Sequence, residues 1–201
     1  MIKSPKIVLA SASASRANLL RNAGLEIVID PAAIDEDTIK TSMAADGSPP
    51  HDVAQALADL KALRRSGSHP EEFVIGADQM LVCEGRWYDK PQNREAARQQ
   101  LSALSGKHHQ LLSAVTVARE GTIIWRHLDR ATLTMRSLSP EFIEQYLISE
   151  GDSILGSVGA YRLEGRGAQL FSRIQGDYFT ILGLPLLPLL DFLRTHRLLL
   201  V

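Results

Sequence analysis

The first residues that could do chemistry form a run of small side chains that ends in an arginine, Leu9-Ala10-Ser11-Ala12-Ser13-Ala14-Ser15-Arg16. Small residues let a ligand approach the backbone closely, and a loop that enters a helix presents unpaired N–H groups to an anion. The serine hydroxyls add donors, and the Arg16 guanidinium is a planar fork suited to phosphate oxygens. The run lacks a glycine-rich Walker pattern, so spacing alone favours a plain helix start in which Ser15 is the N-cap.

A second candidate is the acid in Val74-Ile75-Gly76-Ala77-Asp78, which follows two small residues in an apolar run. A carboxylate in such a place can hold a divalent cation or accept a proton from water. The alternative is a turn or capping aspartate. Because the apolar run resumes at Met80, Asp78 would lie inside or beside a strand, where an unpaired carboxylate is costly. That placement favours a functional role.

The remaining candidates are weaker when taken singly. Lys61 lies on the inner-edge face of a predicted helix, and Lys90 follows a predicted hairpin, but most lysines are solvated surface residues. Glu164 lies in a glycine-rich stretch that could line a pocket or form a tight turn. The six histidines show no ligand spacing, so a zinc site is set aside. Together the candidates suggest a cradle of cations and hydroxyls with scattered carboxylates, which suits metal-assisted phosphoryl chemistry.

Composition bounds the class of protein. The 201 residues are 45% hydrophobic with a net charge of -1, which indicates one globular domain and argues against a broad nucleic-acid surface. The single cysteine, Cys83, excludes an internal disulfide and is expected to be buried. The N-terminus lacks the apolar core of a secretory signal, and the stretch 181–190 falls short of the ~20 residues of a membrane span. A cytoplasmic location follows as the default.

The elements that must position these residues follow from periodicity and turn signals. Strands are predicted over 6–10, 25–29, 73–83, 86–88, 111–119, 122–126, 130–136 and 178–182. Helices are predicted over 16–23, 52–65, 93–104, 139–149 and 189–197, with Gly24 as a left-handed cap and Ser139 as an N-cap. The stretch 34–50 is expected to be loop with at most one helical turn. Strands outnumber the possible crossovers, which indicates an α/β fold with a mixed sheet.

The order of these motifs resembles the Maf family of nucleotide pyrophosphatases, and the resemblance covers nearly the whole chain. The matching positions are Leu9–Arg16, Glu36, Lys61, Gly76-Ala77-Asp78, Asp89-Lys90-Pro91, Leu104-Ser105-Gly106-Lys107, Gly159-Ala160-Tyr161, Glu164-Gly165 and Leu182-Gly183-Leu184-Pro185. The resemblance implies a single domain over 1–201 with a central mixed twisted sheet flanked by helices. It also implies two lobes around a cleft, as in inosine triphosphate pyrophosphatases.

The resemblance further implies roles for individual residues. Asp78 would be the proton acceptor, and Ser11, Ser13 and Arg16 would belong to a phosphate-binding loop. The positions that match Glu36, Lys61 and Lys90 would line the same cleft. Glu164 is a further candidate for binding the substrate. The cofactor would be magnesium or manganese, held by Asp78 with Glu36 or Glu164. The partner would be a small nucleoside triphosphate, without nucleic-acid polymer or membrane, and a homodimer is the family-level expectation.

Several positions depart from the family pattern and bear on the substrate. Many members carry two consecutive arginines where this chain has Ser15-Arg16, and a threonine where it has Gln79. An Asp-Lys pair often stands where this chain has Ser157-Val158. Glu164-Gly165, with Gly167, Leu170 and Phe171 after it, resembles the branch active on 7-methyl-GTP, whereas Tyr161 is shared more with the branch active on dTTP and UTP.

The sequence therefore predicts a hydrolase in which water attacks the α-phosphorus, Asp78 accepts the proton and pyrophosphate leaves, with Arg16, Lys61 and Lys90 neutralising charge. Two alternatives stay open. One is a protein that binds a nucleotide or a division partner without hydrolysis, and the other is a related enzyme with a purine preference such as inosine triphosphate.

Overall fold

The computed structural model describes residues 6–200. The strands are β1 (Ile7–Leu9), β2 (Ile27–Ile29), β3 (Phe73–Cys83), β4 (Arg86–Tyr88), β5 (His108–Arg119), β6 (Thr122–Met135) and β7 (Phe171–Gln175). The α-helices are α1 (Ala14–Asn22), α2 (Glu36–Ala45), α3 (Pro50–Ser66), α4 (Arg94–Leu104), α5 (Pro140–Glu150), α6 (Tyr178–Ile181) and α7 (Leu186–Thr195). Three short 3-10 helices lie at Gly151–Gly156, Val158–Ala160 and Arg166–Leu170. Within this part of the chain, no helix combines the length and apolar character needed to cross a membrane.

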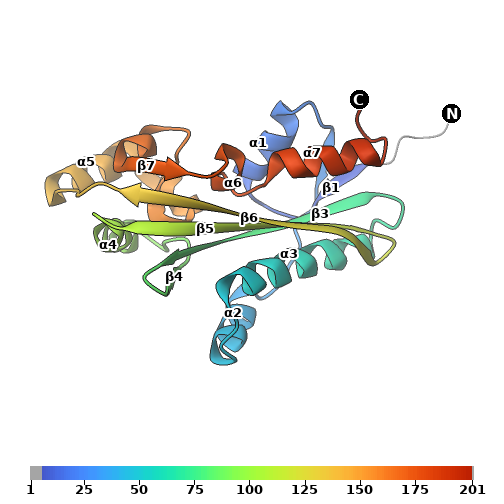
Figure 1. The fold of residues 1–201 in the computed structure, drawn as a ribbon, viewed down its shortest axis with the longest axis horizontal. Helices are drawn as coiled ribbons and strands as arrows, with labels where there is room; N and C mark the ends of the chain where they lie inside the picture. Colours follow the sequence, from blue (N-terminus) through green and yellow to red (C-terminus); the bar gives the residue numbers. More distant parts are fainter. Residues whose placement is uncertain (1–5, 201) are drawn as a thin grey trace. The chain divides into compact units, whose positions relative to one another are not determined.

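The strands form a seven-stranded mixed sheet in the order β2-β1-β3-β5-β6-β7, with β4 paired to β3. β1 runs parallel to both β2 and β3, whereas the β3–β4 and β6–β7 pairs are antiparallel. The predicted α/β class with a central mixed sheet and flanking helices is thus confirmed (Figure 1).

The chain divides into two compact units. Of the described residues, unit 1 comprises 6–79, 113–129 and 183–200, and unit 2 comprises 80–112 and 130–182. Strands β3, β5 and β6 each contribute residues to both units.

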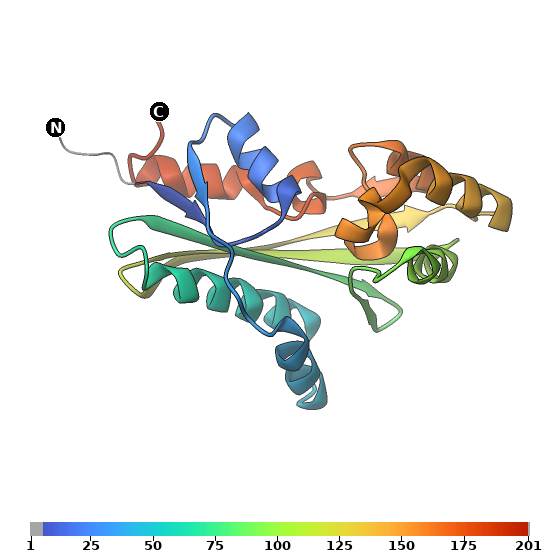
Figure 2. The ribbon, with the colours of Figure 1, turned by 180° about the vertical axis from the view of Figure 1, so that it is seen from behind.

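In unit 1, helices cover both faces of the sheet. Figures 1 and 2 show α1 and α7 on one face and α3 on the other. Phe192 of α7 packs against Phe73 of β3 and stacks on Trp125 of β6, with ring centroids 6.4 and 5.0 Å apart. On the opposite face, Asp59 of α3 pairs with Arg126 of β6 at 2.9 Å. The neighbours Trp125 and Arg126 therefore point to opposite faces, as strand alternation requires.

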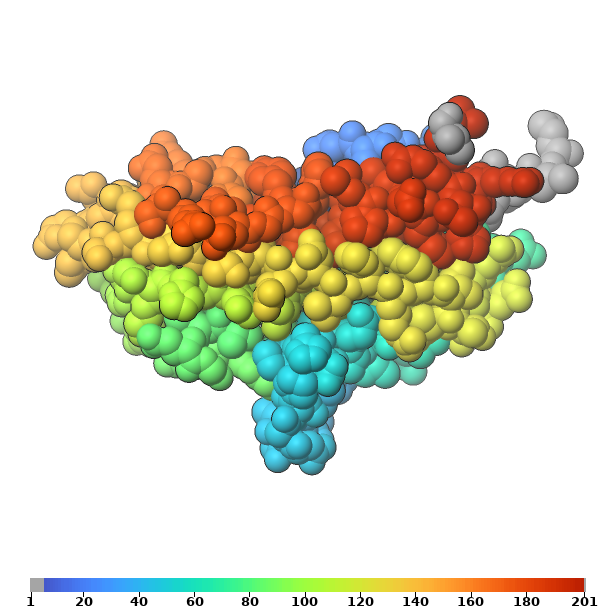
Figure 3. Space-filling model, viewed as in Figure 1, coloured from blue at the N-terminus to red at the C-terminus, as the bar shows by residue number. Residues whose placement is uncertain are grey.

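Helix α2 buries no residue and projects from this unit in Figure 3.

Unit 2 has its own apolar core under α4 and α5. That core includes Leu81, Leu101, Leu133, Leu147 and Tyr161, all at least 95% buried. Cys83 is buried here as predicted. The predicted N-cap of α5 is confirmed, because Ser139 Oγ accepts from the Phe142 N–H and Pro140 is the first helical residue.

Four expectations about elements were wrong. The stretch 34–50 holds the three-turn helix α2, whose N-cap Asp35 accepts from the Thr38 N–H. The stretch 178–182 is the short helix α6 rather than a strand, because Asp177 caps its first N–H groups. The strands predicted over 122–126 and 130–136 are one continuous strand, β6. The N-cap of α1 is Ser13, not Ser15.

Candidate active site

The site begins with a close approach of helix α3 to strand β3 at Gly76. A Cβ atom on Gly76 would lie 2.1 Å from the Ala58 carbonyl oxygen and 2.6 Å from the Ala62 nitrogen, so only glycine fits. Residues two apart on a strand share a face, so Asp78 points toward α3 as Gly76 does. Lys61 immediately precedes Ala62 on that helix. The glycine that precedes Asp78 thus brings the lysine within reach of the carboxylate.

Lys61 bridges two carboxylates. Its Nζ donates to Asp78 Oδ1 at 2.7 Å and lies 2.7 Å from Glu36 Oε1 at the start of α2. Lys61 and Asp78 are both buried, at 6% and 5% exposure. The second oxygen of Asp78, Oδ2, is also buried and has no hydrogen-bond partner among the described residues. This oxygen is therefore available to accept a proton or to contact a cation.

The charges around Glu36 keep that carboxylate ionised. Burial favours the neutral form, but the cations of Lys61, Lys40 and Arg16 together outweigh burial and lower the pKa of Glu36 below its usual value. The Glu36 carboxylate therefore carries its charge at neutral pH.

The serine-rich run forms a compact turn at the N-terminus of α1. Ser11 Oγ accepts from the Ser13 N–H at 3.3 Å and from Arg16 Nη1 at 3.2 Å. Ser13 Oγ accepts from the Arg16 N–H at 3.4 Å and caps the helix. A hydroxyl oxygen that already accepts two hydrogen bonds interacts further mainly through its O–H. The Ser11 hydroxyl is thus set to donate to an anion at the positive end of α1.

Arg16 is buried, at 8% exposure, and its guanidinium bonds to backbone carbonyls as well as to Ser11. Nη1 donates to the Ala77 carbonyl at 2.8 Å and Nε donates to the Gly183 carbonyl at 2.8 Å. Burial lowers the pKa of the guanidinium, while the charges of Asp78 and Glu36 oppose that shift. The family resemblance implied a side chain directed at phosphate, whereas in the structure Arg16 donates three hydrogen bonds to the protein.

The structure thus brings six of the eight predicted site residues together in unit 1, namely Ser11, Ser13, Arg16, Glu36, Lys61 and Asp78. Lys90 and Glu164 belong to unit 2. Lys90 is exposed and lies two residues beyond β4. The Glu164 carboxylate accepts from Arg162 Nε at 3.2 Å.

Sequence reasoning did not assign roles to Gly183 or to the backbone of Ala77, although both belong to motifs of the family pattern. Gln79 is one of the positions that depart from the family pattern. Its Nε2 donates to Ser113 Oγ at 2.9 Å, and Ser113 lies on β5, the strand next to β3. A side chain one residue from Asp78 points to the other face of the strand. Gln79 therefore belongs to the surroundings of Arg16 rather than to those of Lys61.

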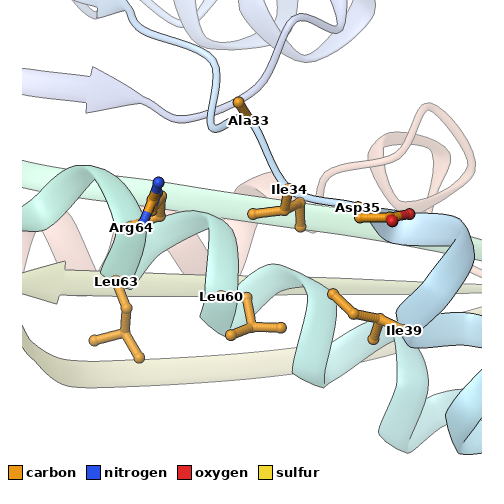
Figure 4. A pocket seen from close by; sticks show the side chains of 7 residues that line it. All are labelled: Ala33, Ile34, Asp35, Ile39, Leu60, Leu63 and Arg64. Carbon is orange, nitrogen blue, oxygen red and sulfur yellow. The ribbon is translucent and has the colours of Figure 1, made fainter.

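A pocket of about 550 Å³ lies beside this cluster, between the segment that precedes α2 and helix α3 (Figure 4). It is lined by Ala33, Ile34, Asp35, Ile39, Leu60, Leu63 and Arg64. The lining is largely apolar, so it lacks the dense set of donors that a triphosphate needs. The pocket is next to Glu36 and Lys61 in sequence, yet neither residue lines it.

The carboxylates of Asp78 and Glu36 are too few for a metal site built from protein ligands alone, but their number suits magnesium. Within residues 6–200, no group of three or more His, Cys, Asp or Glu side chains is arranged to hold a metal ion. Magnesium, however, is commonly held by one or two carboxylates together with water and substrate phosphates. Asp78 with its unpartnered Oδ2, and Glu36 across Lys61, provide that smaller set.

Comparison with known proteins places the chain among close relatives. A nucleoside triphosphate pyrophosphatase of Paramagnetospirillum magneticum is 53% identical over 94% of this chain and 97% of that protein. A protein of the same name from Granulibacter bethesdensis is 51% identical over 96% and 98%. The 7-methyl-GTP pyrophosphatase of Brucella abortus is 50% identical over 96% of each chain. A solved dITP/XTP pyrophosphatase from Mycobacterium abscessus covers 65% of this chain at 19% identity with a TM-score of 0.36, too low to support a conclusion.

The family comparison agrees with the relatives. The model for Maf-like proteins matches residues 6–196, which include all eight predicted site residues. With this match, and with relatives at about half identity along nearly the full chain, the resemblance in the motifs is confirmed: the chain belongs to the Maf family.

Proposed function

We propose that this protein hydrolyses a nucleoside triphosphate to the nucleoside monophosphate and pyrophosphate. The observation that carries the proposal is the buried Lys61–Asp78 pair with an unpartnered Asp78 Oδ2, close to a helix N-terminus whose serine hydroxyl can donate to an anion. The names of the relatives support this reaction and do not favour a protein that only binds.

In the proposed reaction, a water molecule attacks the α-phosphorus and loses its proton to Asp78 Oδ2. The bond between the α-phosphorus and its bridging oxygen breaks, and pyrophosphate leaves. Lys61 holds the Asp78 carboxylate by one oxygen, so that the other oxygen faces the water. The Ser11 and Ser13 hydroxyls would donate to phosphate oxygens. The roles of Lys90 and Glu164, as a cation for the leaving group and a substrate contact, rest on the family resemblance.

A divalent cation, magnesium or manganese, is part of the proposal. Asp78 and Glu36 would hold it, and when bound it would neutralise charge on the triphosphate.

We also propose 7-methyl-GTP as the preferred substrate. Glu164-Gly165 and the residues that follow resemble that branch, and a 7-methyl-GTP pyrophosphatase is 50% identical. A cytoplasmic location and a homodimer likewise remain predictions from the sequence.

The test is a panel of 7-methyl-GTP, GTP, UTP, dTTP and inosine triphosphate, with magnesium, in which pyrophosphate release is measured. We expect turnover with at least one substrate, highest for 7-methyl-GTP, and a loss of roughly 10²–10⁴-fold in Asp78→Asn, the scale of general base catalysis. Turnover of the whole panel at background rates, or an Asp78→Asn variant as fast as wild type, contradicts the proposal. Highest turnover with UTP and dTTP contradicts only the proposed base preference.

A further inference from the structure

The inference concerns the three hydrogen bonds of Arg16 described above. Its Nε–H and both hydrogens of Nη1 are accounted for by protein acceptors, two of which are backbone carbonyls. A side chain recruited mainly to bind phosphate would turn these donors toward the ligand. Here one planar group instead joins three chain segments.

Each acceptor is next to a part of the proposed site. The Ala77 carbonyl immediately precedes Asp78 on β3, and the Gly183 carbonyl lies in the turn before α7. The Ser11 hydroxyl is the proposed phosphate donor. Arg16 therefore fixes the backbone that carries the catalytic carboxylate relative to the loop that would receive the triphosphate.

The bond to Ser11 also sets the direction of that hydroxyl. With Arg16 and the Ser13 N–H both donating to Ser11 Oγ, the O–H is left as the hydrogen-bonding group that faces a ligand. Donation from a cation makes that O–H a stronger donor. Arg16 thus acts on phosphate through Ser11.

Gly183 shows how closely the guanidinium is enclosed. Its backbone has φ +95, and a Cβ atom there would lie 3.4 Å from Arg16 Nε, 3.6 Å from Nη2 and 3.7 Å from Gln79 Oε1. A Cβ atom there would make ordinary van der Waals contact with the guanidinium, so the cost of a larger residue is the backbone strain of its positive φ. The turn before α7 and Arg16 therefore form one packed unit.

We propose that Arg16 is a positioning residue, which clamps Ser11, Ala77 and Gly183 together, rather than a direct ligand of the triphosphate. This inference rests on the proposed function. It predicts that Arg16 affects the rate of the chemical step more than the affinity for substrate.

The experiment compares Arg16→Lys, Arg16→Met and Gly183→Ala, with Arg21→Lys, an exposed position on the same helix, as the matched control. Lysine keeps the charge but its ammonium cannot span the three acceptors. We expect Arg16→Lys to lose kcat about as severely as Arg16→Met, on the order of 10²-fold, with KM changed less than about threefold. Gly183→Ala, which lies outside the proposed substrate contacts, should show the same pattern in milder form.

A double-mutant cycle tests whether Arg16 and Gly183 act together. If they form one clamp, Arg16→Lys combined with Gly183→Ala should be no more than about threefold slower than Arg16→Lys alone. The same cycle measured by urea unfolding should show that the two effects on stability are not additive. The unfolding measurement does not depend on activity, so it tests the clamp even if no nucleotide is hydrolysed.

The outcomes are distinguishable. If Arg16→Lys keeps kcat and KM near the wild-type values while Arg16→Met raises KM tenfold or more, Arg16 is a phosphate ligand and the inference is overturned. Additive effects in both cycles overturn it as well. A wild-type protein without turnover on the whole panel, but with coupled unfolding, refutes the proposed function and leaves the clamp in place.

Discussion

Replacing Gly76 with alanine tests whether the close contact between β3 and α3 builds the site. The added Cβ would lie 2.1 Å from the Ala58 carbonyl oxygen, 2.6 Å from the Ala62 nitrogen and 2.9 Å from the Ala62 Cβ. Two of these atoms are backbone, so no side-chain rotation relieves the overlap. Helix α3 would have to withdraw by roughly 1 Å, and Lys61 would move with it.

The expected losses in stability and in kcat both follow from the displacement of α3. Inserting a methyl group into a packed core costs about 1–3 kcal/mol of stability. A misplacement of about 1 Å in a catalytic group can lower the rate by roughly 10²-fold. We therefore expect Gly76→Ala to fold with reduced stability and to lose about two orders of magnitude in kcat.

The assay pairs urea unfolding with pyrophosphate release under saturating substrate. Gly67→Ala is the matched control, since Gly67 ends α3, has negative φ and has open space around its Cβ position. A second comparison combines Gly76→Ala with Ala62→Gly. That change removes the contact at 2.9 Å but neither backbone contact, so the double variant should remain impaired.

Wild-type stability and turnover in Gly76→Ala would refute this reasoning, because α3 would then have room that the structure does not show. Full recovery by Ala62→Gly would place the constraint in the side chain of Ala62 instead of the helix backbone.

Three further predictions follow from the same contacts. Lys61→Met removes the cation that bridges Asp78 and Glu36 and that contributes most to lowering the pKa of Glu36, so the acidic limb of the pH profile of kcat/KM should move upward, and an unchanged limb would contradict the bridge. Glu36→Gln should raise the magnesium concentration for half-maximal turnover roughly 10–100-fold, the scale seen when groups that support a metal are removed, and an unchanged requirement would remove Glu36 from the metal site. His109 is buried against the Tyr161 hydroxyl at 2.7 Å, and burial, with a smaller effect of His108, lowers its pKa to about 4. The unfolded chain takes up a proton on His109 near pH 6.5, whereas the folded protein does so only near pH 4. The free energy of unfolding should therefore fall by about 3 kcal/mol between pH 6.5 and pH 4. In His109→Gln, this part of the pH dependence should be absent from urea unfolding curves.

Local chemistry alone determined much of this protein. The apolar spacing of α3, the Ser139-Pro140 start of α5 and the left-handed Gly24 after α1 are set by neighbours in sequence, and all three are confirmed. Where strand-forming side chains competed with a cap, as in α6 after Asp177, side-chain type misled the prediction. The aspartate cap was the better local signal there and at α2.

The contacts within the site could be predicted only in part from the sequence. Asp78 stood out because a charge inside an apolar run is costly, and the order of motifs named its companions. Only tertiary structure decided that Lys61 bridges Asp78 and Glu36, since these residues are far apart in the chain and meet where Gly76 admits α3. Only tertiary structure directed Arg16 to the carbonyls of Ala77 and Gly183, because backbone acceptors leave no trace in residue type. Sequence determines which groups are present, whereas packing determines which of their donors and acceptors remain for a substrate.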